Sequence, residues 1–314
     1  MQEQLIRSKN LQWRNIIQLT EEKLVRLQKQ YRFHDLDLED CLSKTESPKL
    51  EEHDDYVFVL LHFPLKDVRT EHISIEAVQI FIGQHYLITL SSGKLKALED
   101  FFQHLRHKHR EKHEVFQKGS GYLLYLLINK LFEIYVPYLY QLHRTIREIE
   151  ADLFEGKILK DRLYDIMSVK RQIITLKRAL LPHSGIIKSL EQLHKRFISK
   201  ELELYFDDVG DKITRGKANL EEMQEMITTL RDANESLTSH NTNRVMKILT
   251  VISVTILPLT FITGLYGMNI DLPFSATKVT QVLHDLENVP LGQNGIFNRL
   301  INSKFVIQLD APHL

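Results

Sequence analysis

The chain has 314 residues, in which 41 lysines and arginines balance 41 acidic residues, and its mean hydropathy is −0.22. This composition excludes disordered, collagen-like and disulfide-rich chains, and the absence of net charge leaves no global field for holding nucleic acid. We therefore expect no nucleic-acid partner. Cys41 is the single thiol, so an internal disulfide is excluded, which suits a reducing compartment.

Strand signals dominate residues 55–90. Three runs rich in β-branched and aromatic residues follow one another there, DYVFVLLHF, HISIEAVQIFIG and HYLITL, with Gly83-Gln84 as the expected hairpin turn. Residues 20–43 instead place apolar side chains at helical spacing, namely Leu24, Leu27 and Tyr31. The pattern predicts that strands and helices mix in a first part, residues 1–120.

Helical periodicity replaces the strand pattern from Gly121 onward. Long amphipathic stretches follow, with a break expected at Pro182 and Gly185. We expect a helical second part over residues 121–243, which includes the start of a very long helix.

That long helix is expected between Asp208 and Tyr266, where Pro258 is the only proline and no loop signal occurs. About 59 helical residues at 1.5 Å each correspond to roughly 88 Å, far longer than a globular helix. Such a helix would transmit conformational changes of the soluble part into a membrane.

The longest uncharged run, from Ile248 to Ile270, has 23 residues, and about 20 apolar residues span the hydrocarbon core of a bilayer. It predicts a transmembrane helix within residues 244–270. Arg244 and Lys247 precede the run, so the positive-inside rule places the N-terminal part in the cytoplasm.

Residue types within the span sort by helix face. Two neighbouring rows at heptad spacing consist mainly of small or hydroxylated residues, with Met246 and Leu257 as the exceptions: Met246, Ser253, Thr260 and Gly267 beside Thr250, Leu257 and Gly264. The opposite positions are bulky and branched, among them Ile248, Ile252, Ile256, Leu259 and Ile262. Two interpretations stay open: several copies could turn the stripe inward to line a pore, or the small residues could allow close helix packing.

The segment NTNRVMKILTVISVTILPLTFITGLYGMN closely resembles the signature of the CorA family of magnesium channels, whose Tyr-Gly-Met-Asn motif is here Tyr266 to Asn269. Further matches are LQWRN, HDLDLEDCL, YVFVLLHF, GYLLYLLIN and YFDDV, so the resemblance covers roughly residues 11–275. It implies an α+β fold: a homopentameric funnel of cytoplasmic α/β domains, each followed by a very long stalk helix that continues into a transmembrane helix of the cell (plasma) membrane.

The resemblance also implies roles for residues of the span. Gly267, Met268 and Asn269 resemble the ion-selecting mouth, and pore-lining positions fall at Asn243, Met246, Leu249, Leu257 and Thr260, to which the small-residue stripe adds Thr250, Ser253 and Gly264. Mg²⁺ gives up its water reluctantly, so a ring of asparagine carbonyls can select the hydrated ion without stripping it. An apolar ring at Met246 and Leu249 could close the pore by dewetting.

An acidic region precedes the predicted strands. Residues 34–55 contain nine acids and two bases, a local charge of −7. Such a run is usually a solvated surface. The resemblance instead implies a regulatory metal site: Glu39 and Asp40 match the acidic pair of the family, Asp208 matches a carboxylate that faces it from a neighbouring subunit, and Asn129 stands where the family has a third carboxylate. Mg²⁺ bound there would hold subunits together, and its loss would open the gate.

Other motifs point away from catalysis. The histidines of HLRHKHREKH, from His104 to His113, include two residues one helical turn apart, but no acid stands between them in zinc-protease order, and a solvated basic helix is the better interpretation. No phosphate-binding loop, nucleophile elbow or cysteine pair occurs in the sequence. We expect a protein that is not an enzyme.

The C-terminal residues 271–314 depart from the family. Its members return through the bilayer in a second transmembrane helix, whereas the last 36 residues here contain no uncharged run near 18 residues. We expect a divalent-cation channel subunit with Mg²⁺ as transported and regulatory ion and Co²⁺ or Ni²⁺ as further candidate cargo. The alternatives are a zinc-type relative and a membrane-anchored, non-conducting metal sensor.

Overall fold

The computed structural model describes residues 3–43, 46–66, 73–155, 163–193, 195 and 197–267. The chain divides into two compact units, Met1–Asn234 and Glu235–Leu314. This division falls inside a helix, whereas the part boundaries expected at residues 120, 243 and 270 stay predictions.

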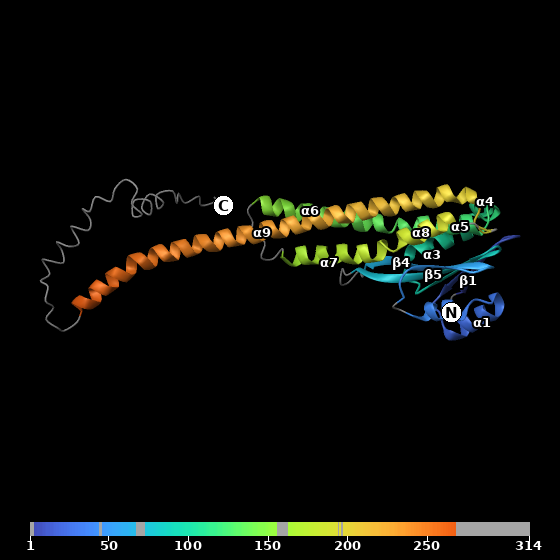
Figure 1. Cartoon of the computed structure of the whole chain (residues 1–314), viewed down its shortest axis with the longest axis horizontal. Coiled ribbons are helices and arrows are strands. Elements are labelled where there is room, and N and C mark those ends of the chain that lie inside the picture. The colour runs from blue at the N-terminus through green and yellow to red at the C-terminus, as the bar shows by residue number, and fades with distance from the viewer. Residues whose placement is uncertain are drawn as a thin grey trace. The chain divides into compact units, whose positions relative to one another are not determined.

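A mixed β-sheet lies between two layers of helices in the first unit (Figure 1). Its strands in the described residues are β1 Glu3–Arg7, β2 Gln12–Ile17, β3 Lys49–Glu52, β4 Tyr56–Lys66, β5 Ile73–Gly83 and β6 Tyr86–Ser91. Their order is β1-β2-β6-β5-β4-β3. The contact between β2 and β6 is parallel, and the other neighbours are antiparallel.

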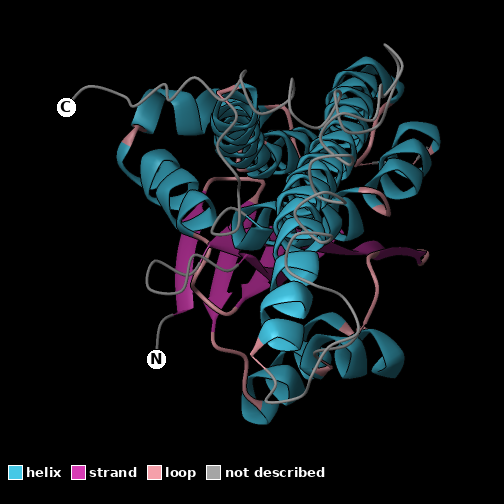
Figure 2. Cartoon of the chain, turned by 90° about the vertical axis from the view of Figure 1, so that its left-hand side faces the viewer, coloured by secondary structure: helices cyan, strands magenta, loops and turns pink. Residues whose placement is uncertain are grey.

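The sheet buries both of its faces. Along β4, Val57, Val59, Leu61 and Phe63 belong to one core cluster, whereas Tyr56, Phe58 and Leu60 belong to the other. This alternation follows from the period of two in a strand, and burial on both sides explains why the three predicted strands read as nearly continuous apolar runs. Their prediction is confirmed, and Figure 2 shows helices on either side of the sheet.

Two helices, α1 Glu21–Tyr31 and α2 Asp35–Leu42, cover one face, as expected for residues 20–43. The hydroxyl of Thr20 caps α1 by accepting a hydrogen bond from the backbone of Lys23, and Arg32, in the left-handed conformation at φ 57°, ends it. Leu24, Leu27, Leu38 and Cys41 turn inward to the second core cluster. The helical expectation is thus confirmed, but as two helices.

The hairpin turn lies one residue later than expected. β5 ends at Gly83, which pairs with Tyr86, so Gln84 and His85 form the turn. A Cβ atom on Gly83 would lie 2.6 Å from the Tyr86 ring. Gly83 therefore makes room for the cross-strand aromatic side chain instead of supplying the turn conformation.

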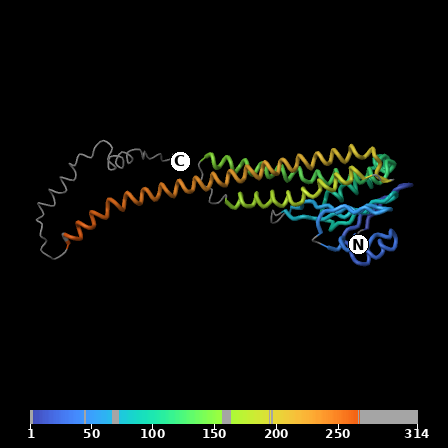
Figure 3. Tube along the Cα trace, viewed as in Figure 1, coloured from blue at the N-terminus to red at the C-terminus, as the bar shows by residue number. Residues whose placement is uncertain are grey.

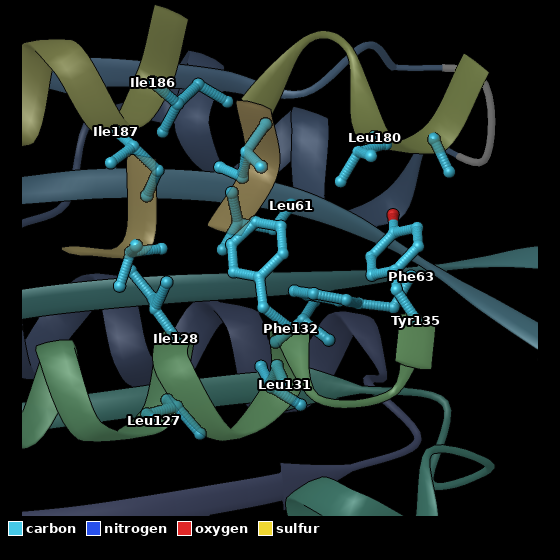
Figure 4. Close-up of a cluster of buried hydrophobic side chains, with 14 of the residues drawn as sticks. Leu61, Phe63, Leu127, Ile128, Leu131, Phe132, Tyr135, Leu180, Ile186 and Ile187 are labelled. Atoms are coloured by element: carbon cyan, nitrogen blue, oxygen red, sulfur yellow. The ribbon is translucent and has the colours of Figure 1, made fainter. Parts of the chain in front are cut away.

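Helices cover the opposite face of the sheet: α3 Lys96–His107, α4 His109–Gln117, α5 Ser120–Phe132, α6 Tyr135–Phe154, α7 Leu163–Leu180, α8 His183–Gln192 and the short 3₁₀ helix η1 Lys200–Leu202. The predicted break occurs at Pro182, which directly precedes α8. Gly185 was expected in the same break but lies inside α8. Figure 4 shows Leu61 and Phe63 of β4 packed among side chains of these helices.

His183 joins α8 to the sheet from within this core. Its Nε2 atom accepts a hydrogen bond from the backbone N–H of His62 at 3.0 Å, and its ring packs against Phe63 and Phe132. Burial lowers the pKa of His183 to about 3, so the imidazole stays neutral and keeps its acceptor at neutral pH.

The long helix is present as α9, Glu203–Tyr266, with 64 residues and Pro258 inside it. Its trace runs without interruption in Figure 3. In the first unit it buries an apolar stripe at three- and four-residue spacing: Phe206, Val209, Ile213, Leu220, Met223, Ile227 and Leu230. This packing anchors the helix to the α+β unit, and the predicted continuity is confirmed.

Candidate functional site

The predicted acidic pair lies on α2. Glu39 is exposed, whereas Asp40 is buried, with 12% of its side chain accessible, and its Oδ2 atom lies 2.6 Å from the ammonium nitrogen of Lys49 at the start of β3. The neighbouring carboxylate of Asp40 raises the pKa of Lys49. The chain itself therefore neutralises one carboxylate of the pair.

Asp37, on the same helix, belongs to the acidic region but has no role implied by the resemblance. Its buried carboxylate accepts a hydrogen bond from the Tyr56 hydroxyl at 2.6 Å and lies 2.8 Å from Nε2 of His53. Burial, followed by the hydrogen bond to Asp37, raises the pKa of Tyr56. These contacts hold α2, the helix that carries Glu39 and Asp40, against the start of β4.

The other two predicted ligands, Asn129 on α5 and Asp208 on α9, meet at one lysine. The ammonium nitrogen of Lys212 lies 2.7 Å from Oδ2 of Asp208 and 2.7 Å from Oδ1 of Asn129. The carboxylate of Asp208 also contributes, after burial, to raising the pKa of Tyr125. Sequence reasoning missed Lys212, although its four-residue spacing from Asp208 is a recognised signal for a helical ion pair.

The four predicted metal ligands do not form one site within a chain. α2 packs on one core cluster through Leu38 and Cys41, whereas α5 and the start of α9 pack on the other, across the sheet. In the described ranges no group of three or more histidine, cysteine and acidic side chains is placed to hold a metal. A bridge between Asp40 and Asp208 therefore needs two subunits, and it stays a prediction.

The histidine segment lies on α3 and α4. His104, His107, His109 and His113 are exposed, and Nε2 of His104 lies 2.5 Å from Oε2 of Glu111. The segment forms the end of α3 and the start of α4, which meet at Lys108, so the single basic helix that was expected is two helices.

The apolar part of α9 belongs to the second unit. Among the described residues one helical stretch, Lys200–Leu265, is long and apolar enough to cross a membrane, with an 18-residue window of mean hydropathy 2.2 that is 0% buried. The pore-lining candidates Asn243, Met246, Leu249, Thr250, Ser253, Leu257, Thr260 and Gly264 are all exposed. In the single chain the bulky face is largely exposed too, so exposure does not separate the two faces.

Hydroxyl groups of the predicted pore stripe donate back to their own helix. The hydroxyls of Thr250, Ser253 and Thr260 contact the carbonyls of Met246, Leu249 and Ile256 at 2.8, 2.9 and 2.7 Å. Their protons thus need no further partner, while the oxygen lone pairs stay available as acceptors.

The predicted selectivity motif begins where the described residues end. The backbone N–H of Gly267 donates to the carbonyl of Thr263 at 2.9 Å, which continues the hydrogen bonding of α9. Met268 and Asn269 lie outside the described residues, as do residues 271–314, in which the sequence predicts the loss of a second transmembrane helix.

Together these features define a chain whose α+β unit continues through one helix into an apolar span. A family model described as CorA-like Mg2+ transporter protein matches residues 8–283. The chain therefore belongs to the CorA-like Mg²⁺ transporter family, as the sequence resemblance implied, and this family consists of transporters.

Individual relatives agree with this assignment. The cobalt/magnesium transport protein CorA of Thermotoga maritima is 29% identical over 77% of this chain and 68% of its own length. The complete structure of the CorA magnesium transporter from Methanocaldococcus jannaschii matches with a TM-score of 0.72 at 25% identity, covering 87% of this chain and 84% of that chain. The zinc transport protein ZntB of Pectobacterium atrosepticum is more distant, 24% identical over 62% of this chain and 57% of its own length.

Proposed function

We propose that the chain is a subunit of a homopentameric channel that passes Mg²⁺ passively across the plasma membrane, with the α+β unit in the cytoplasm. The observation that carries the proposal is the family match over residues 8–283, which includes α9 and the motif Gly267, Met268 and Asn269. Arg244 and Lys247 before the span support the orientation. A potential of 100 mV contributes about 2.3 kcal/mol per charge, or about 4.6 kcal/mol for a divalent ion, so no energy-coupling site is needed.

In this channel the ion is selected at the motif Gly267, Met268 and Asn269, and the pore closes nearer the cytoplasm. Five Asn269 carbonyls accept hydrogen bonds from the first water shell of the ion, which Mg²⁺ retains. Five copies of Met246 and Leu249 form an apolar constriction that empties of water when the subunits close. Between them, the hydroxyl oxygens of Ser253 and Thr260 offer acceptors to the hydrated ion.

Replacing Leu249 with Asn is expected to raise Mg²⁺ entry in the closed condition about tenfold, because a polar ring holds water where an apolar ring excludes it; this corresponds to about 1.4 kcal/mol. Entry into liposomes loaded with a Mg²⁺-sensitive dye measures the effect. The matched control is Ile248→Asn, the adjacent position on the bulky face, which should not raise entry. Equal increases in the two variants would contradict the assignment of the pore face.

The ion carried is proposed as Mg²⁺, with Co²⁺ or Ni²⁺ as further cargo. The same liposome assay with Zn²⁺ in place of Mg²⁺ tests the zinc-type alternative, for which Zn²⁺ would enter faster than Mg²⁺. The motif favours magnesium and cobalt, because the zinc branch usually alters the residue at the position of Met268.

Mg²⁺ binding to the cytoplasmic unit is proposed to close the channel. Glu39 and Asp40 of one subunit and Asp208 and Asn129 of the next supply the oxygen ligands that Mg²⁺ prefers, and metal bound there offsets repulsion between the subunits. Transport thus limits itself as cytoplasmic Mg²⁺ rises.

Asp208→Ala is expected to weaken the protection that Mg²⁺ gives the cytoplasmic unit against protease, because one bridging carboxylate is lost. The measurement is the fraction of full-length chain that survives limited proteolysis in detergent across a Mg²⁺ titration. Protection identical to that of the unmodified protein would count against metal sensing.

A second function has an observation in its favour. The family match ends at residue 283, and residues 279–314 lack an uncharged run near 18 residues. The second candidate is therefore a membrane-anchored metal sensor that passes no ions, in which the apolar part of α9 is the anchor.

A further inference from the structure

Two lysines stand at the positions where the proposed function places a regulatory metal. Asp40 and Asp208 are the carboxylates proposed to be bridged between subunits, and each already contacts an ammonium group of its own chain. Lys49 lies 2.6 Å from Oδ2 of Asp40, and Lys212 lies 2.7 Å from Oδ2 of Asp208. Within one chain the two contacts occur on opposite sides of the sheet, so neither lysine touches the carboxylate of the other.

The contact at Lys212 has the form of a cation held by two oxygen ligands. Its ammonium group lies 2.7 Å from the carboxylate of Asp208 and 2.7 Å from the amide oxygen of Asn129, and it thereby links α9 to α5. Carboxylate and amide oxygens are also ligands that suit Mg²⁺. The donor set therefore fits the metal, but a lysine of the same chain lies between the two donors.

We propose that Lys49 and Lys212 are built-in cations that compete with Mg²⁺ for the regulatory carboxylates and so raise the Mg²⁺ concentration at which the channel closes. This inference rests on the proposed function, since it concerns the same site. Each ammonium neutralises a carboxylate in the absence of metal, and Mg²⁺ has to displace it to bind.

The two lysines differ in how readily they can be displaced. Asp208 and Lys212 have 51% and 39% of their side chains exposed, and an ion pair of this kind is weak, so a divalent ion can replace it. The side chain of Asp40 is only 12% exposed and that of Lys49 31%, so this pair is less screened by solvent. As the Mg²⁺ concentration rises, Lys212 is therefore displaced from its carboxylate first. Displacement of Lys49 needs a higher Mg²⁺ concentration and sets the concentration at which closure is complete.

The test is limited proteolysis of the full-length chain in detergent across a Mg²⁺ titration. Lys212→Gln is expected to lower the Mg²⁺ midpoint of protection about threefold, and the double variant with Lys49→Gln about tenfold. These factors follow from the usual strength of such ion pairs. Lys217→Gln is the matched control, because Lys217 forms an exposed pair with Glu221 at 4.0 Å on the same helix, and it should leave the midpoint unchanged. Lys212→Arg keeps the charge and should also stay within about twofold of the unmodified protein.

The outcomes separate this inference from the function on which it rests. Unchanged Mg²⁺ midpoints in the lysine variants, together with lost protection in Asp208→Asn, would refute the competition between the lysines and Mg²⁺. Metal sensing itself would stand. Protection that does not depend on Mg²⁺ in any of these variants would overturn both. A circular-dichroism spectrum and melting temperature equal to those of the unmodified protein establish that each variant is folded, and Lys212→Gln replaces an exposed side chain that such measurements should hardly register.

Discussion

A methyl group added at Gly121 is expected to destabilise the cytoplasmic unit by about 3 kcal/mol, the upper range for overpacking a close contact. Gly121 lies in the first turn of α5, where a Cβ atom would stand 2.2 Å from the backbone carbonyl oxygen of Phe197 and 2.7 Å from Leu202. A backbone oxygen cannot rotate away as a side chain can. Gly121→Ala must therefore push the segment that leads into α9 away from α5.

The matched control for this prediction is Gly185→Ala. Gly185 lies inside α8, and no heavy atom lies within 4 Å of the place that a methyl group would take, so alanine should stabilise the helix by about 0.5–1 kcal/mol. Chemical unfolding of the full chain in detergent, followed by the fluorescence of the buried Trp13, measures both variants. Equal stabilities would contradict the close packing of α5 against the segment that leads into α9.

This contact also affects the candidate site. α5 carries Asn129 and α9 carries Asp208 and Lys212, so the alignment of the two helices sets the distances at Lys212. We expect Gly121→Ala to disturb Mg²⁺ protection as well as stability, unlike Gly185→Ala.

Much of the fold could be predicted from the sequence because its patterns are long and regular. β4, β5 and β6 contain apolar runs bounded by turn residues, and α9 has no helix-breaking proline before Pro258. β1, β2 and β3, with the sequences EQLIR, QWRNII and KLEE, are polar at half or more of their positions, so they lack the apolar run that marks β6. β2 gains its place through a parallel contact with β6, about 70 residues away, that no local pattern encodes.

The candidate site could be predicted only in part. Glu39, Asp40, Asn129 and Asp208 followed from resemblance to the family, and the acidic region of residues 34–55 was visible as charge. The partners of these acids were not, because they depend on the sheet that places Lys49 beside Asp40 and on the helix pair that places Lys212 beside Asn129. A lysine near an acid in sequence is common, and only the folded chain shows which one lies within hydrogen-bonding distance.

Asn269→Ala is expected to abolish Mg²⁺ conduction while the chain still folds and assembles. In the proposed mouth the amide oxygens of Asn269 replace bulk water as acceptors for the first hydration shell of the ion, and alanine offers no acceptor. Because Mg²⁺ keeps its water, the substitution hinders passage of the hydrated ion. It leaves the fold of the cytoplasmic unit unchanged. Melting of the cytoplasmic unit and its Mg²⁺ protection should therefore be unchanged in this variant.

Mg²⁺ entry driven by a membrane potential into liposomes that contain the purified 314-residue chain decides whether the chain conducts. We expect entry with the unmodified chain and, with Asn269→Ala, entry no faster than in protein-free liposomes. No entry from a correctly assembled unmodified chain would contradict the channel and favour the anchored, non-conducting sensor.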